Sequence, residues 1–137
     1  MASSVDRDAP ARKEIGLLAL LICASLTAVD GDTVKCDGQS FRDMGDGAPF
    51  VSGYDTPEIG RNADCDRENA LGKKAKRRMA ELIRTPGLLI EESGEIDRYD
   101  RPLVVLRLPD GRTIGNVLLA EGLAVEWRPG GDFDWCQ

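Results

Sequence analysis

Asp30-Gly31-Asp32-Thr33 and Asp55-Thr56-Pro57-Glu58 are the two stretches around which this chain is organised. Each places carboxylates beside residues that favour turns, and together they supply Asp32, Asp55 and Glu58. Carboxylates in such loops are the oxygen ligands that hard cations such as Ca²⁺ prefer. Two of them can hold a cation while the third stays available for proton transfer.

Two arginines complete this set of groups. Arg42 lies between the two stretches, and Arg101 closes the segment Asp97-Arg98-Tyr99-Asp100-Arg101. A guanidinium forks onto two phosphate oxygens, and a bound cation polarises a phosphoryl oxygen. The combination therefore favours metal-assisted attack on a phosphodiester.

Composition limits the alternatives. The 137 residues suffice for one domain, and 42% hydrophobic with 31% charged residues indicate a soluble globular chain. The sequence has no histidine, which excludes Ser-His-Asp and Cys-His nucleophilic sites. Its four cysteines form no CxxC pair, so we do not expect a zinc site. The net charge of −6 argues against broad, non-specific nucleic-acid binding, but not against a small site with its own arginines.

The N-terminal region allows two interpretations. We expect residues 1–14 to be frayed, and residues 15–29 carry no charge. That run is either the apolar part of a signal or anchor segment or, in part, a first buried strand that leads into Asp30. We therefore divide the chain into residues 1–25, an N-terminus with an apolar segment, and residues 26–137, the folded domain.

Local patterns predict an α+β domain. Apolar residues at helical spacing predict a long helix over about 67–84, capped by Asp64 or Asp66 and ended by Pro86-Gly87. The basic run at 73–78 is either a phosphate-facing patch or, as we favour, a solvated helix face. A short helix over Asn116–Glu121 ends at Gly122. The expected strands are Thr33–Cys36, Ser40–Met44, Leu88–Glu92, Leu103–Leu108, Thr113-Ile114 and Leu123–Trp127.

Taken in order, these motifs resemble the staphylococcal nuclease-like (thermonuclease) family from about Leu26 to Trp127. The stretches that carry the resemblance are Asp30-Gly31-Asp32-Thr33-Val34, Phe41-Arg42, Gly53-Tyr54-Asp55-Thr56-Pro57-Glu58, Ala70-Leu71-Gly72, Asp97-Arg98-Tyr99-Asp100-Arg101-Pro102-Leu103, Asp110-Gly111 and Leu118-Leu119-Ala120-Glu121-Gly122-Leu123-Ala124. The resemblance implies an OB-fold, a five-stranded β-barrel with one long and one short helix packed on it. It also implies a calcium-dependent endonuclease that hydrolyses DNA and RNA with low sequence specificity.

The resemblance implies a role for each matched residue. Asp32, Asp55 and the carbonyl of Thr56 would bind Ca²⁺, and Glu58 would act as general base. The remaining residues would contact phosphate: Arg42 and Arg101 as a clamp on the scissile group, and Tyr99 and Arg98 on the substrate.

One departure from the family lies between the two motifs. The family places its arginine five residues before the aspartate, whereas Arg42 precedes Asp55 by thirteen. The surplus of eight corresponds to residues 45–52, which we interpret as a looped-out insertion because loop closure costs little entropy.

The resemblance leaves one alternative function open: a nuclease-like OB module that binds nucleic acid or a protein partner without cutting. For the enzyme we expect DNA and RNA as partners, single strands preferred, no protein partner and a monomer. We expect the chain to be secreted, periplasmic or anchored through residues 15–29, with the cytoplasm as the alternative. Cys65 and Cys136 could form a disulfide, although four cysteines allow three complete pairings.

Overall fold

A computed structural model describes residues 11–15 and 18–137, with side chains from Ala19 onward. The expected fraying of residues 1–14 falls mostly outside the described residues, although Ala11–Ile15 is a strand. No described helix is long and apolar enough to cross a membrane.

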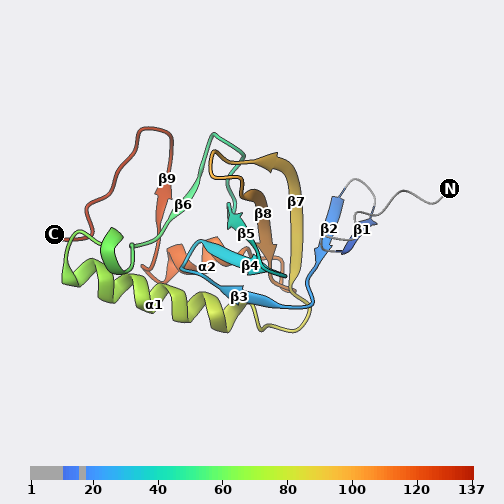
Figure 1. Ribbon diagram of the computed structural model, residues 1–137, viewed down its shortest axis with the longest axis horizontal. Coiled ribbons are helices and arrows are strands. Elements are labelled where there is room, and N and C mark those ends of the chain that lie inside the picture. Colours follow the sequence, from blue (N-terminus) through green and yellow to red (C-terminus); the bar gives the residue numbers. More distant parts are fainter. Residues whose placement is uncertain (1–10, 16–17) are drawn as a thin grey trace.

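A curled β-sheet forms the body of the molecule (Figure 1). In the described residues its strands follow the order β1-β2-β7-β8-β5-β4-β3, and all pairs are antiparallel except β5 with β8. The strands β7-β8-β5-β4-β3 make the half-barrel, and β2 and β1 extend it beyond β7. Their bounds are Ala11–Ile15 (β1), Leu18–Ile22 (β2), Leu26–Ala28 (β3), Thr33–Cys36 (β4), Gln39–Asp43 (β5), Leu89–Ile96 (β7) and Pro102–Arg107 (β8).

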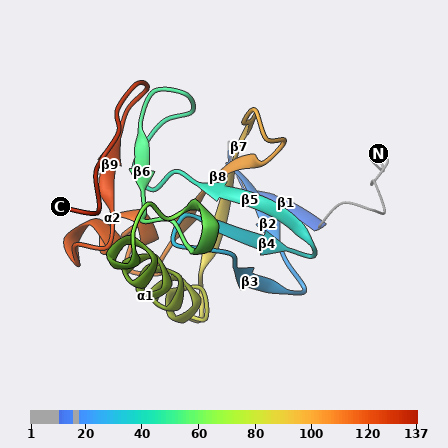
Figure 2. The ribbon, with the colours of Figure 1, turned by 60° about the vertical axis from the view of Figure 1, so that its left-hand side comes forward.

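Two helices and a small second sheet complete the α+β fold. The long helix α1 (Asp66–Leu82) runs beside β3, and the short helix α2 (Ile114–Ala120) packs between α1, β6 and β8. Strands β6 (Gly53–Asp55) and β9 (Val125–Trp127) pair antiparallel, as both views show (Figures 1 and 2). A 3₁₀ turn, η1 (Gly60–Asn62), precedes α1. The predicted α+β fold class, an OB-like fold with one long and one short helix, is confirmed, and the five strands β7-β8-β5-β4-β3 form a curled half-barrel.

The core lies between the curled sheet and the helices. The predicted helical stripe is buried at Ala75, Met79 and Leu82, where it meets sheet residues such as Phe41 and Leu106. Burial of such side chains stabilises a fold by roughly 1.5–3 kcal/mol each. The stripe therefore fixes which face of α1 points inward.

Two local predictions need correction, and one strand was missed. The N-cap of α1 is Cys65, whose sulfur accepts a hydrogen bond from the Glu68 N–H at 3.4 Å, and not Asp64 or Asp66. Thr113 does not begin a strand beyond one isolated bridge, because its Oγ1 accepts from the Asn116 N–H at 3.0 Å and caps α2. Strand β6 was not predicted, since three residues beginning with glycine carry no alternation to detect.

The apolar run separates into strands on either side of a disulfide. Leu18–Ile22 forms β2, which pairs with β7, and Leu26–Ala28 forms β3, which pairs with β4. This corresponds to the strand interpretation for residues 18–28. Cys23, between the two strands, is bonded to Cys36 at the end of β4.

A second disulfide joins Cys65 to Cys136, the pairing that we expected. It fastens the C-terminal tail to the start of α1, and Figure 1 shows the chain end beside that point. Two disulfides indicate an extracellular or otherwise oxidising compartment.

Candidate active site

The turn between β3 and β4 holds the first carboxylate of the site. Asp30 Oδ1 accepts hydrogen bonds from the backbone N–H groups of Asp32 and Thr33, both at 2.9 Å, and so shapes the turn. Asp32 is only 6% exposed, and the Thr33 hydroxyl donates to its Oδ1 at 3.0 Å. Asp32 is thus a buried carboxylate at the start of a strand.

Arg42 reaches this turn from the neighbouring strand. Residue Thr33 of β4 is directly opposite Arg42 of β5, and the Arg42 guanidinium forms an ion pair with Asp32. The same guanidinium donates to the carbonyl of Tyr54 at 2.5 Å. Residues 45–52 form a loop between β5 and β6, so the insertion leaves Arg42 beside the strand that ends at Asp55.

The second stretch packs directly on the first. Thr56 is buried, and its hydroxyl donates to Asp32 Oδ2 at 3.4 Å. A Cβ on Gly31 would lie 2.7–2.8 Å from the Thr56 side chain, so only glycine permits this approach. Asp55 is half-buried and Glu58 is exposed. The predicted residues of both stretches are therefore brought together.

Arg101 joins the same group from the loop between β7 and β8. Its Nη1 donates a hydrogen bond to the Thr33 hydroxyl at 3.0 Å, and its Nε donates one to the Asp97 carboxylate at 2.8 Å. Thr33 therefore links Arg101 to Asp32. Tyr99 is 63% exposed, and its ring lies 5.3 Å from the Arg101 guanidinium carbon. Arg98 donates to the Tyr99 hydroxyl at 2.8 Å, which leaves this pair on the surface at the edge of the site.

The carboxylates repel one another. Burial raises the pKa of Asp30 to about 7 and the pKa of Asp55 to about 6, and the negative charge of Asp32 contributes to both shifts. Partial burial and the charges of Asp32 and Asp55 also raise the pKa of Glu58. Burial opposes ionisation of Asp32 too, but the charge and hydrogen bonds of Arg42 outweigh it and lower the pKa of Asp32. Such a cluster favours a bound cation, which would relieve the repulsion.

The donor set fits a hard cation. Asp32 and Asp55 offer carboxylate oxygens, and the adjacent Thr56 offers a backbone carbonyl, which suit Ca²⁺ completed by water. Within the described residues no group of three or more acidic, thiol or imidazole side chains could hold a metal. The predicted ligand set differs from such a group, because it consists of two carboxylate side chains, Asp32 and Asp55, and one backbone carbonyl, that of Thr56.

A family model for the staphylococcal nuclease homologue matches residues 50–132. This chain belongs to the staphylococcal nuclease homologue family. The match includes Asp55, Glu58 and Arg101, whereas Asp32 and Arg42 lie before it and are joined to it by the contacts described above. This family is one of nucleases that typically use Ca²⁺. No curated protein matches the chain.

Sequence reasoning missed the residues that support the site of this nuclease homologue. Thr33 bridges Asp32 and Arg101, and the buried Tyr54 hydroxyl lies within hydrogen-bond distance of both the Gly31 carbonyl and the Asp43 carboxylate. Only the β4–β5 register, which places Thr33 opposite Arg42, could have suggested the first of these.

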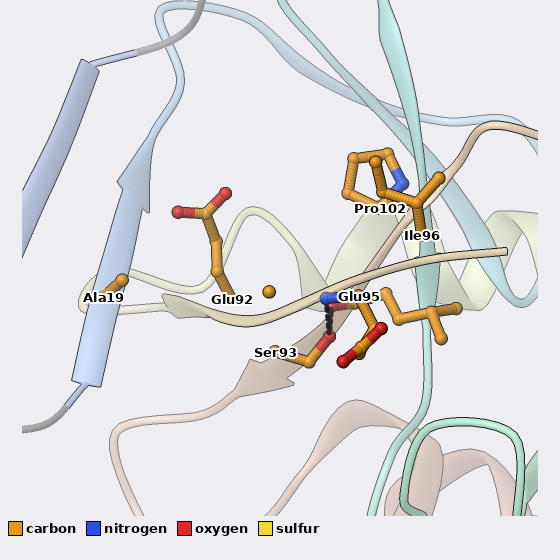
Figure 3. A pocket seen from close by; sticks show the side chains of 8 residues that line it. Ala19, Glu92, Ser93, Glu95, Ile96 and Pro102 are labelled. Atoms are coloured by element: carbon orange, nitrogen blue, oxygen red, sulfur yellow. Dashed lines mark hydrogen bonds between the residues drawn. The ribbon is translucent and has the colours of Figure 1, made fainter.

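A separate cavity of about 440 Å³ lies by the irregular end of β7 (Figure 3). Its lining comprises Ala19, Glu92, Ser93, Gly94, Glu95, Ile96, Pro102 and Leu103. None of these residues is basic and two are acidic, so the cavity is unsuited to a phosphate group.

Proposed function

We propose that this family member is a calcium-dependent nuclease that hydrolyses DNA and RNA phosphodiester bonds with low sequence specificity. The observation that carries the proposal is that Asp32 and Thr33 join three distant segments, which contain Arg42, Thr56 and Arg101. The buried Asp32 contacts Arg42 and Thr56, and its neighbour Thr33 contacts Arg101. A catalytic role explains why so many charged groups meet at one place.

In this proposal each residue has a defined task. Asp32, Asp55 and the Thr56 carbonyl hold Ca²⁺, which when bound polarises a phosphoryl oxygen. Arg42 and Arg101 bind the phosphate and stabilise the charge that accumulates on it. Glu58 accepts the proton of the attacking water through its exposed carboxylate.

Substrate and location follow from the same arrangement. The site is open at Glu58 and Tyr99, both exposed, which suits a flexible single strand better than a rigid duplex. Tyr99 and Arg98 would then contact a neighbouring phosphate. The two disulfides support secretion or a periplasmic location, and we propose that the protein acts as a monomer.

The second candidate is a nuclease-like module that binds without cutting. The net charge of −6 and the inserted loop at 45–52 favour it. The presence of the full set of two metal-binding aspartates, one glutamate and two arginines favours the enzyme, because a module that only binds does not need a general base.

Cleavage of denatured DNA in Ca²⁺ distinguishes the two candidates. Glu58→Ala should lower kcat by about 10²–10⁴-fold, the usual contribution of general-base catalysis. Glu126→Ala, which removes an exposed carboxylate from β9, is the matched control and should cut normally. Binding of DNA without any cleavage by the unaltered protein would favour the non-cutting module.

A further inference from the structure

A buried glutamate on α1 holds the backbone of the proposed general base. Glu68 is 5% exposed, and its two carboxylate oxygens accept from two different backbone groups. Oε2 accepts from the Glu58 N–H at 3.0 Å, and Oε1 accepts from the Asp64 N–H at 2.8 Å. One side chain therefore spans both ends of the segment from Glu58 to Asp64.

The same helix contacts this segment at two further points. Asn69 Oδ1 accepts from the Gly60 N–H at 2.8 Å. One turn along, a Cβ on Gly72 would lie 2.5 Å from the Glu58 carbonyl oxygen, so glycine allows the helix to touch the backbone there. Glu58 is thus held on both its N–H and its carbonyl side, while its side chain remains exposed.

The helix start that carries Glu68 is itself fixed. Cys65 caps α1 through its hydrogen bond from the Glu68 N–H, and its disulfide to Cys136 ties this turn to the C-terminal tail. Both views place the chain end beside the start of α1 (Figures 1 and 2). The position of Glu68 is therefore set by elements outside the site.

We propose that Glu68 is a positioning residue, which orients Glu58 toward the attacking water by fixing the Glu58 backbone. The inference rests on the proposed nuclease function. Burying a carboxylate is costly unless its hydrogen bonds are satisfied, and both oxygens of Glu68 are used on this one segment. Helix stability alone needs no such partners, because an exposed acidic residue in the first turn already interacts with the helix dipole.

Asp66 provides the matched control. It lies in the same first turn of α1 and is exposed, so Asp66→Asn removes the same charge without touching the Glu58 segment. Glu68→Gln replaces one of the two acceptor oxygens with an NH₂ group, which cannot accept a hydrogen bond from a backbone N–H. Glu68→Asp keeps the charge but is too short to span both donors, and serves if the glutamine variant does not fold.

The first measurement is kcat and KM on a short single-stranded oligonucleotide. Glu68→Gln should lower kcat by about 10- to 100-fold, the effect of misplacing a catalytic group, with little change in KM. In the Glu58→Ala background the same substitution should have almost no further effect, because the group it positions is gone. An equal loss in both backgrounds would mean a purely structural role and overturn the proposal.

The second measurement is amide hydrogen exchange, which needs no activity. The amides of Glu58 and Asp64 should exchange at least about tenfold faster in Glu68→Gln than in Asp66→Asn. Unchanged exchange would show that Glu68 does not hold the Glu58 backbone, and would overturn the proposal. Faster exchange in a protein that cuts nothing, even unaltered, would refute the proposed function and with it any catalytic effect of Glu68.

Discussion

Asp43 offers a test of the electrostatics beneath the site. It is fully buried at the end of β5, and its Oδ1 accepts from the N–H groups of Gly45 and Leu106, both at 3.1 Å. The Tyr54 hydroxyl lies 2.8 Å from Asp43 Oδ2 and 3.0 Å from the Gly31 carbonyl. A hydroxyl has one proton for these two acceptors, so a proton on Asp43 would complete the chain of hydrogen bonds.

The size of the expected change in stability follows from the pKa of Asp43. Burial raises the pKa of Asp43 from 3.8 to about 6. A raised folded-state pKa means that the native state binds the proton more tightly, so this stabilisation is complete below pH 3.8 and is lost as pH rises through about 6. At about 1.4 kcal/mol per pKa unit, the loss is at most about 3 kcal/mol.

Asp43→Asn places a permanent donor where the proton would be. The amide can donate to Tyr54, whose hydroxyl then donates to Gly31, while the amide oxygen keeps both backbone donors. We expect the variant to be more stable than the unaltered protein at pH 8 by about 1–3 kcal/mol and to lose that advantage at pH 4.

Urea unfolding at both pH values measures this difference. Asp30 and Asp55 also titrate in this range, but their contributions cancel when the two proteins are compared at the same pH. Asp43→Ala is the control, and it should be destabilising at both pH values because it leaves buried N–H groups without an acceptor. An asparagine variant that is less stable at pH 8, or a difference that does not change with pH, would refute the reasoning.

Three other predictions concern the site and its supports. Arg42→Lys and Arg101→Lys should each lower kcat/KM on denatured DNA by about 10²–10³-fold, since lysine cannot form the bidentate contact; near-normal turnover would count against the clamp. Gly31→Ala should destabilise the fold by about 1–3 kcal/mol in urea unfolding, because the new Cβ meets the Thr56 side chain at under 3 Å; unchanged stability would disprove this close packing. Cys136→Ser should cost about 2–5 kcal/mol under oxidising conditions and nothing relative to the unaltered protein in reductant.

Much of the fold could be predicted from local sequence patterns. The stripe of Ala75, Met79 and Leu82 fixes α1, and Gly122, with φ +74°, ends α2 as expected. The candidate site residues could be named because paired carboxylates and arginines beside turn residues carry a recognisable chemistry. Their meeting through Thr33 depends on strand register, which a short strand does not encode by itself.

The unpredicted features are those that depend on non-local contacts. Glu68 looks like an ordinary first-turn acid until its partners Glu58 and Asp64 are seen. The cap at Cys65 displaced the two aspartates because a disulfide holds that residue in place. In both cases the feature depends on a tertiary contact, which the local sequence does not indicate.

Calcium-dependent release of acid-soluble nucleotides from denatured DNA tests the central claim most directly. The unaltered protein should release nucleotides in millimolar Ca²⁺ and stop when excess chelator is added, whereas Asp32→Asn should release almost none at any calcium concentration. Release that continues in chelator, or full activity in Asp32→Asn, would contradict the assignment of this cluster as a calcium-dependent nuclease site.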